Sequence, residues 1–367
     1  MAAVERILII KPSSLGDIIH TLPLVHALKR CCAKVSIGWV VEQAFSSLLA
    51  ADPAIDRIYP IHIPSTSDPD SGKSAYLAAG RATVQTLEQL RRSFKVRPYD
   101  LVLDLQASFR SGLLAMMNPG GRRIGFADAR ELNTYFQHER IRIPAGTSHA
   151  LDKNLLFAHH LGCTVGDEDF FLSTTDEAEE EVAQFLQLEA IHAKAGLVYV
   201  QPAARWQSKQ WLPERWAELA DTLTRSGLQP VFGGSKADLP LLGAITSHMQ
   251  TQGHIAAGQL SLLAGAALIK ASAVYVGVDT GPMHMAALAG RPVVALFGPT
   301  HPERVGPYKT ASRVIQAAGL DCLCCRKRFC DHQSCMQQIS VEMVANAVQE
   351  LLAEEKAGKT DGRPVQA

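Results

Sequence analysis

The stretch "VYVGVDTGPMHMAALAGRPVVALFGPTHPERVGPY" (274–308) decides the fold class. Its first apolar run, 273–279, has the length and β-branched content of a buried strand. Residues 281–290 follow as a short helix that ends at Gly290, and "PVVALFGPT" (292–300) is the next strand. A strand, a helix and a second strand in this order are typical of a parallel sheet with helices packed on it.

The same alternation extends over most of the chain. In the first half the short strand-like runs are "RILII", "VSIGWVV", "RIYPI", "YDLVLDL" and "RRIGF". After "STTDEAEEEVAQFLQL" (173–188), whose acidic residues suit the first turn of a helix, the alternation restarts with "GLVYVQP", "QPVFGG" and "HIAAG". The sequence therefore predicts two α/β domains, 1–173 and 174–338, then an amphipathic helix at 339–358 and a flexible tail at 359–367.

The composition excludes several classes of protein. The chain has 367 residues, of which 47% are hydrophobic and 20% charged, as in ordinary globular proteins. Lys plus Arg equals Asp plus Glu at 36 each, so no global field favours nucleic acid. Residues 1–10 lack a signal-peptide pattern, and no apolar run approaches the roughly 18 residues of a membrane span. We expect a cytoplasmic protein.

Ligands of parallel α/β sheets bind beyond the carboxyl ends of the strands. In the second half, Asp279, Thr280 and Gly281 occupy such a strand-to-helix turn, where free N–H groups and the helix dipole favour phosphate. Lys209 follows another strand and is able to neutralise a diphosphate, and Asp238 follows a third, placed for a ribose hydroxyl. The alternative is that Asp279 and Thr280 only cap the helix.

The turn "KPSSLGDIIHTLP" (11–23) is the corresponding place in the first half. Gly16 permits a tight turn, Ser13 and Ser14 offer hydroxyl and backbone donors, and Asp17 begins the helix. The alternative for Asp17 is an N-cap. No GxxxxGK[ST] loop is present, nor a GxGxxG after the first strand, which disfavours phosphoryl transfer and dinucleotide redox chemistry.

Three motifs together, "KPSSLGDIIHTLP", "VDTGPMHMAALAG" and "LFGPTHPERVGPY", resemble glycosyltransferase family 9, the ADP-heptose:lipopolysaccharide heptosyltransferases. The resemblance implies the GT-B fold, in which two Rossmann-like domains with parallel sheets face each other across a cleft. It places the acceptor on 1–173, the nucleotide-sugar on 174–338, and the helix 339–358 back toward the first domain. It also implies an inverting enzyme without metal or cofactor.

The resemblance assigns roles to single residues. Asp17 takes the place of the family's general base, and Lys209 stabilises the leaving diphosphate. The implied donor-binding residues are Ser14, Gly16, Lys209, Asp238, Asp279, Thr280, Gly281, Met283 and His284. The implied partners are ADP-heptose, the inner core of lipopolysaccharide (Kdo-lipid A) and, peripherally, the cytoplasmic face of the inner membrane.

The acceptor side is locally basic, because residues 81–142 contain eleven Lys or Arg and six Asp or Glu. Most of the arginines near 91–97 fit a solvated helix face. The predicted acceptor-binding residues, which belong to strand-end loops or to the turn at 11–23, are Ser13, His20, Gln106, Arg110, Arg123 and Arg130. The arginines suit the carboxylates of Kdo and the phosphates of lipid A. A structural role for His20 is the alternative.

Five of the eight cysteines lie in "DCLCCRKRFCDHQSC" (321–335), together with His332. The spacing lacks two clean CxxC pairs, so we expect reduced thiols in a loop, with a structural metal as the alternative. The total count does not suggest a disulfide scaffold.

Two other functions fit the same sequence. A GT-B nucleotide-sugar epimerase would turn over without acceptor. A non-catalytic nucleotide-sugar-binding protein would keep its function when Asp17 is replaced by alanine.

Overall fold

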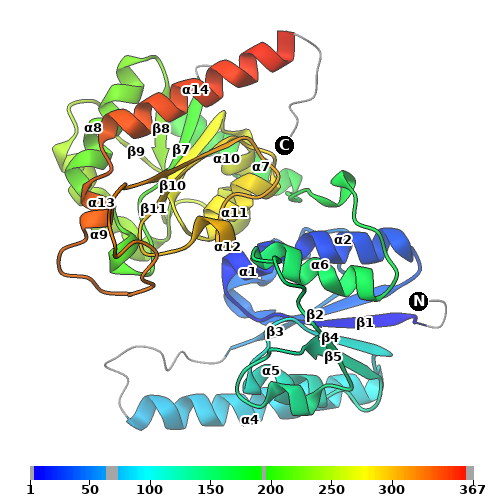
Figure 1. Cartoon of the computed structure of the whole chain (residues 1–367). Helices are drawn as coiled ribbons and strands as arrows, with labels where there is room; N and C mark the ends of the chain where they lie inside the picture. The colour runs from blue at the N-terminus through cyan, green and yellow to red at the C-terminus, as the bar shows by residue number, and fades with distance from the viewer. Residues whose placement is uncertain (1–3, 63–72, 192–195, 361–367) are drawn as a thin grey trace. The chain divides into compact units, whose positions relative to one another are not determined.

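A computed structural model describes residues 4–62, 73–191 and 196–360. The chain divides into two compact units, Met1–Ser173 and Thr174–Ala367. Each unit is an α/β structure built on its own sheet (Figure 1). The predicted tail at 359–367 lies mostly outside the described residues.

The first unit contains a six-stranded sheet in which every pairing is parallel, in the order β3-β2-β1-β4-β5-β6. β1 is central, with Ile7 opposite Ile37 on β2 and Leu101 on β4. Its side chains are buried from Ile7 to Ile10, as expected for a strand covered on both faces. The strands are β1 (Arg6–Ile10), β2 (Ser36–Glu42), β3 (Arg57–Ile61), β4 (Leu101–Asp104), β5 (Arg122–Phe126) and β6 (Glu139–Ile141).

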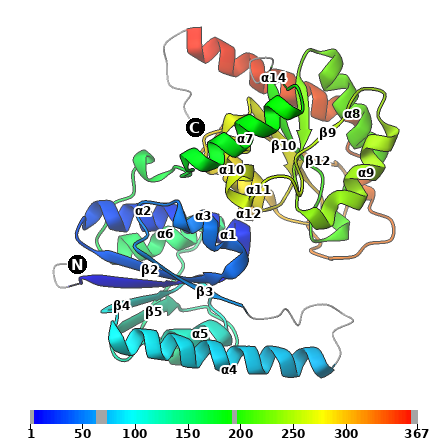
Figure 2. The ribbon, with the colours of Figure 1, turned by 180° about the vertical axis from the view of Figure 1, so that it is seen from behind.

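Helices cover both faces of this sheet. Figures 1 and 2 show α2 and α6 on one face and α4 and α5 on the other. The helices are α1 (Leu15–Ile19), α2 (Leu22–Cys31), α3 (Ser46–Ala50), α4 (Lys73–Val96), α5 (Phe109–Met116) and α6 (Ala150–His160). Short 3-10 turns are η1 (Gln43–Phe45), η2 (Asn133–Phe136) and η3 (Asp167–Asp169).

The predicted helix after β1 is broken into two pieces. Pro23 lies in the first turn of α2, where its missing N–H costs nothing, but the same proline cannot continue α1. The Thr21 hydroxyl donates to the Asp17 carbonyl (2.8 Å) at the junction. At the far end of α2, Cys31 forms a disulfide with Cys163, a bond across 132 residues that the cysteine spacing did not indicate.

The second unit has the sheet order β12-β11-β10-β7-β8-β9, also with parallel pairings throughout. The strands are β7 (Leu197–Gln201), β8 (Gln229–Phe232), β9 (His254–Ile255), β10 (Val274–Val278), β11 (Val293–Phe297) and β12 (Ser312–Gln316). Helices and turns are α7 (Asp176–Leu188), η5 (Gln207–Lys209), α8 (Pro213–Arg225), η6 (Lys236–Asp238), α9 (Leu239–His248), α10 (Leu262–Ala271), α11 (Gly281–Leu288), α12 (Pro302–Val305), α13 (Ser334–Gln337) and α14 (Val341–Thr360).

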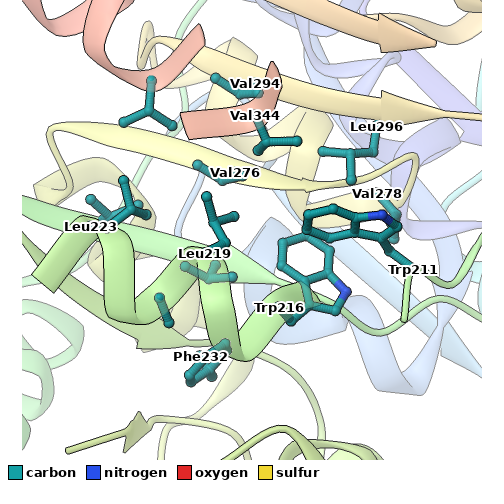
Figure 3. Close-up of a cluster of buried hydrophobic side chains, with 14 of the residues drawn as sticks. Trp211, Trp216, Leu219, Leu223, Phe232, Val276, Val278, Val294, Leu296 and Val344 are labelled. Atoms are coloured by element: carbon teal, nitrogen blue, oxygen red, sulfur yellow. The ribbon is translucent and has the colours of Figure 1, made fainter. Parts of the chain in front are cut away.

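The core of the second unit lies between this sheet and the helices α8 and α14 (Figure 3). Trp211 and Trp216 pack edge to face with ring centroids 5.0 Å apart. Val344 and Leu351 bring α14 into the same core. The buried face of α14 therefore packs within its own unit. The expectation that this helix packs back toward the first domain stays a prediction.

Two edge strands, β6 and β12, were not predicted, whereas the other ten match predicted runs to within a few residues. β6 is three residues long and β12 reads "SRVIQ", so neither has a clear apolar run. No helix in the described part of the chain is long and apolar enough to cross a membrane.

Candidate active site

Each sheet has one point where the strand order reverses, and ligands of open α/β sheets bind at such points. In the first unit it lies between β1 and β4, and in the second between β10 and β7. The loop that begins at Lys11 follows β1, and the loop that holds Lys209 follows β7. The segments that carry Asp17 and Lys209 therefore follow strands at the switch point of each sheet, which is where such sheets bind ligands.

The turn after β1 holds Asp17 with contacts from both sides. Ser14 is the N-cap of α1, and Asp17 is the third helical residue. The Ser14 amide and hydroxyl donate to Asp17 Oδ2 at 3.1 and 2.8 Å, which makes a capping box. Lys11 Nζ lies 3.6 Å from Asp17 Oδ1 and donates to the Leu105 carbonyl (3.1 Å) after β4. Asp17 is thus not the N-cap, as one alternative had it.

These contacts determine the ionisation of Asp17. Burial by itself raises the pKa of Asp17, but the Lys11 ammonium, the two Ser14 hydrogen bonds and the charge of His20 outweigh it, so the pKa is lowered. The Lys11 side chain is 9% exposed, whereas that of Asp17 is 43% exposed. Asp17 is therefore a carboxylate that is ionised at neutral pH and still reachable. Lys11 is a residue of the quoted motif to which sequence reasoning gave no role.

The other predicted residues of this turn have mixed surroundings. Gly16 is buried and Ser13 half-buried. The His20 ring is buried against that of His149, with centroids 5.3 Å apart. This packing favours the structural alternative for His20, although its charge still acts on Asp17. His149 was not predicted.

A buried carboxylate organises the loop after β4. Asp104 is fully buried and accepts hydrogen bonds from the side chains of Ser111 (3.0 Å), Asn133 (2.7 Å) and Gln137 (3.0 Å). Its other oxygen accepts from the Gln106 amide at 3.1 Å. Burial raises the pKa of Asp104, and these hydrogen bonds only partly offset the rise. Within the described residues Gln106 Oε1 is buried without a partner, which leaves an acceptor atom for a ligand at the predicted edge.

The three predicted arginines do not share one environment. Arg110 lies in the first turn of α5 and Arg130 in the segment after β5, and both are exposed. Arg123 is the second residue of β5 and not past its end, which corrects its predicted position. Its Nε donates to the Phe136 carbonyl (2.6 Å), and burial lowers its pKa. Because Arg123 lies toward the amino edge of the sheet, its role in acceptor binding loses support.

In the second unit, Lys209 is held by a buried carboxylate. Its Nζ donates to Asp279 Oδ2 at 2.6 Å and to the Asp279 carbonyl at 3.0 Å, and it lies 4.8 Å from the centre of the Trp206 ring. The Asp279 side chain is 5% exposed, and His284 Nε2 lies 3.9 Å from Asp279 Oδ1. A lysine fixed in this way is a positioned cation at the sheet edge, on the side where an anion would bind.

The turn into α11 has the expected geometry with one exception. Thr280 is the N-cap, but its hydroxyl makes no capping bond within the helix and instead lies 3.3 Å from the Val278 carbonyl. Gly281 is the first residue of the helix, and its N–H points out of the helix N-terminus, where it has no partner within the helix. Met283 is completely buried and its N–H donates to the Thr280 carbonyl (3.1 Å). Met283 therefore has a buried, structural surrounding, and its contact with the donor stays a prediction.

Asp238 repeats the arrangement of Asp17. The Ser235 amide and hydroxyl donate to Asp238 Oδ2 at 2.7 and 2.8 Å, a second capping box. The sequence interpretation of Asp238 as a ribose ligand overlooked this local use of one carboxylate oxygen. Asp238 itself follows β8, at the carboxyl edge of the second sheet and next to β7.

The cysteine segment is tied to the turn that carries Lys209. The Cys324 amide donates to the Gly298 carbonyl (3.1 Å), and the Ser208 hydroxyl donates to the Lys327 carbonyl (2.6 Å). Thr300, in the loop after β11, has a buried hydroxyl without a partner among the described residues, a feature of this edge that sequence reasoning missed. All five cysteines of the cluster are free thiols, and the described residues hold no group of three or more metal-ligating side chains.

Comparison with known proteins places these features in a family. The profile described as "Glycosyltransferase family 9 (heptosyltransferase)" matches residues 87–336. Lipopolysaccharide heptosyltransferase 1 of Pseudomonas aeruginosa is 30% identical over 340 residues, covering 89% of this chain and 88% of that protein. Lipopolysaccharide core heptosyltransferase OpsX of Haemophilus influenzae is 25% identical over 317 residues, covering 85% and 84%.

Solved structures confirm the fold class. The glycosyl transferase family 9 structure from Veillonella parvula superposes with a TM-score of 0.80 at 23% identity, covering 95% of this chain and 97% of that one. The Escherichia coli heptosyltransferase WaaC with ADP gives a TM-score of 0.72 at 24% identity, with coverage of 94% and 99%. Two Rossmann-like units with parallel sheets are the GT-B architecture that the sequence predicts. The profile match and the coverage of these relatives show that the chain belongs to glycosyltransferase family 9, the heptosyltransferases.

Proposed function

We propose that this protein transfers heptose from ADP-heptose to the Kdo-containing inner core of lipopolysaccharide, with inversion at the anomeric carbon and without a metal. The donor is inferred from relatives: one solved neighbour is described as WaaC with ADP-2-deoxy-2-fluoro heptose, and the curated relatives are named lipopolysaccharide heptosyltransferases. We further propose that the enzyme is cytoplasmic and meets its acceptor at the inner face of the inner membrane.

In the proposed reaction the first unit holds the acceptor and the second holds the donor. Asp17 accepts the proton of the acceptor hydroxyl, the acceptor oxygen forms a bond to C1 of the heptose, and the bond from C1 to the diphosphate breaks on the opposite face. ADP leaves with the electron pair. Lys209 and the N–H groups at the start of α11 stabilise the charge that develops on the diphosphate.

The observation that carries this proposal is the state of Asp17: an ionised, partly exposed carboxylate at the switch point of its sheet. A lowered pKa makes Asp17 a weak base toward an unactivated alcohol. A weak base is sufficient when the heptose has oxocarbenium character in the transition state, because the attacking hydroxyl becomes strongly acidic as its bond to C1 forms.

The experiment is nucleotide release from ADP-, UDP- and GDP-sugars, with and without a truncated lipopolysaccharide acceptor. We expect release only with the ADP-sugar and acceptor together, and a product of inverted configuration by NMR. Asp17→Asn should lower kcat by at least about 100-fold while ADP affinity stays within about twofold. Asp56→Asn, which removes a carboxylate paired with Lys29, is the control. Acceptor-independent turnover would indicate an epimerase and contradict the proposal.

A further inference from the structure

Exposed apolar side chains gather on one part of the first unit. Of the fourteen large hydrophobic residues that are exposed in the described chain, eight lie between positions 76 and 135. These eight belong to α4, α5 and the segment from 130 to 136, and α4 and α5 cover the same face of the first sheet (Figures 1 and 2). Soluble proteins scatter such residues, so this concentration indicates an interaction surface.

We call this region the α4–α5 surface and define it by six side chains: Tyr76, Leu77 and Val84 on α4, Phe109 on α5, and Leu132 and Tyr135 near η2. Their exposed fractions run from 44% for Phe109 to 78% for Tyr135. None is in the buried core, and each is large enough to insert among acyl chains or headgroups.

Contacts within the α5 and η2 part hold its apolar side chains together. The Phe109 ring packs edge-on against Phe136 with centroids 5.4 Å apart, and the Phe109 amide donates to the Glu131 carboxylate (3.1 Å). Leu132 has a φ of 61°, a left-handed conformation that is costly for leucine, and it is 65% exposed. The fold thus holds an apolar side chain outward at a conformational cost.

Helix α4 presents its apolar and basic residues on the same exposed face. Leu77, Arg81 and Val84 follow one another at spacings of four and three residues, which places them on one stripe of a helix. The opposite stripe, with Leu90 and Phe94, is buried against the sheet. The C-terminal half of the helix is basic, and its Arg91, Arg92 and Lys95 are all exposed.

The charge of the α4–α5 surface and its surroundings indicates which kind of partner binds there. The excess of eleven basic over six acidic residues in 81–142 occurs in a chain whose net charge is zero. Around η2, Arg140 Nε donates to the Thr134 carbonyl (3.1 Å). Exposed charged residues near η2 also include two basic ones, Arg110 and Arg130, and two acidic ones, Asp128 and Glu131. Long basic side chains around inserted apolar ones match an anionic lipid surface, which attracts the charges and solvates the apolar groups.

We infer that the α4–α5 surface docks the protein onto an anionic lipid bilayer. The inference rests on the proposed function in one respect: a glycolipid acceptor stays in the membrane, so a bound enzyme would meet it with the carboxyl edge of the first sheet, where Gln106, Arg110 and Arg130 lie. Lipid binding itself requires no catalysis.

The test is sedimentation of the full-length protein with vesicles of phosphatidylcholine alone or with added phosphatidylglycerol. We expect binding only to the anionic vesicles, with affinity falling as salt is raised from 50 to about 300 mM. The double variant Leu77→Glu, Val84→Glu should bind at least about tenfold more weakly. The matched control is Leu188→Glu, Met343→Glu, which makes the same chemical change at two exposed helical positions of the second unit and should bind as the wild type does.

Transfer to a deacylated, water-soluble acceptor separates this inference from the proposed function. We expect the α4 double variant to keep wild-type kcat on that acceptor and to lose activity only on acceptor embedded in vesicles. Equal vesicle binding by the double variant and the wild type would overturn the inference. Binding only to protein-containing native membranes would also overturn it and would indicate a protein partner. Vesicle binding without any transfer would overturn the proposed function alone.

Discussion

At the scale of single residues, Lys11 is the group that sets the ionisation of Asp17. It is nearly buried, 3.6 Å from the carboxylate, and held by the Leu105 carbonyl. Replacing Lys11 with methionine removes the charge that lowers the pKa of Asp17 while keeping much of the side-chain volume. We expect the acidic limb of the kcat/KM profile to move to higher pH by about one unit, because Asp17 then holds its proton more tightly. Lys29→Met, which breaks a pair outside the site, should leave the limb in place. A limb that does not move would show that Asp17 is not the titrating base.

Replacing Lys209 should weaken the binding of the donor nucleotide. Lys209→Ala removes the cation and leaves Asp279 buried and unneutralised, so repulsion of the diphosphate adds to the lost attraction. ADP affinity measured by calorimetry should fall about 10- to 100-fold. Lys270→Ala, an exposed lysine of α10, is the control. Unchanged ADP affinity in Lys209→Ala, with the fold intact by circular dichroism, would remove Lys209 from the donor site.

At the scale of elements, the Arg30–Asp169 pair joins α2 to η3. Arg30 Nε and Nη2 donate to the two Asp169 oxygens at 2.9 and 2.7 Å. Burial raises the pKa of Asp169, but the Arg30 hydrogen bonds and the Gly166 amide outweigh it, so the pKa is lowered. The pair therefore stabilises the fold above the unfolded-state pKa near 4, and this contribution is lost as pH falls through the lower folded-state pKa. Asp169→Asn should lower the free energy of unfolding by about 2 kcal/mol at pH 7 and by much less near pH 3, measured by urea titration. An equal loss at both pH values would contradict this assignment.

Sequence patterns predict elements better than they predict contacts. The apolar runs place ten of the twelve strands found in the described residues, because a buried parallel strand needs a continuous apolar stretch. The edge strands β6 and β12 do not need a continuous apolar stretch, so the apolar pattern did not predict them. The motif "KPSSLGD" locates Asp17, and the spacing of Ser14 and Asp17 is that of a capping box, a signal that was not used. Nothing in the spacing indicates that Lys11 reaches Asp17, since that depends on how the loop turns. Arg123 was misplaced although "RRIGF" was itself predicted as a strand, because that strand begins with the two arginines and does not end with them.

At the scale of the whole molecule, each unit has its own sheet and its own apolar core. Leu114 on α5 and Leu219 on α8 are both fully buried helical leucines, one in each core. Leu→Ala at such positions costs about 2–5 kcal/mol. Calorimetry should resolve two components, with Leu114→Ala lowering the melting temperature of one and Leu219→Ala that of the other, by about 5–15 °C. A single component displaced equally by either variant would show that the two units unfold as one.

The parallel direction of all the strands in each sheet has a practical consequence. All the chemistry assigned above to the second unit lies at the carboxyl ends of its strands, so the loops at the other ends are left without ligands. The turn at Ser226 and Gly227, which leads from α8 into β8, is exposed and belongs to those loops. A fluorophore or an affinity handle inserted there should report on the protein, or anchor it to a chip, while nucleotide entry at the opposite rim stays unobstructed.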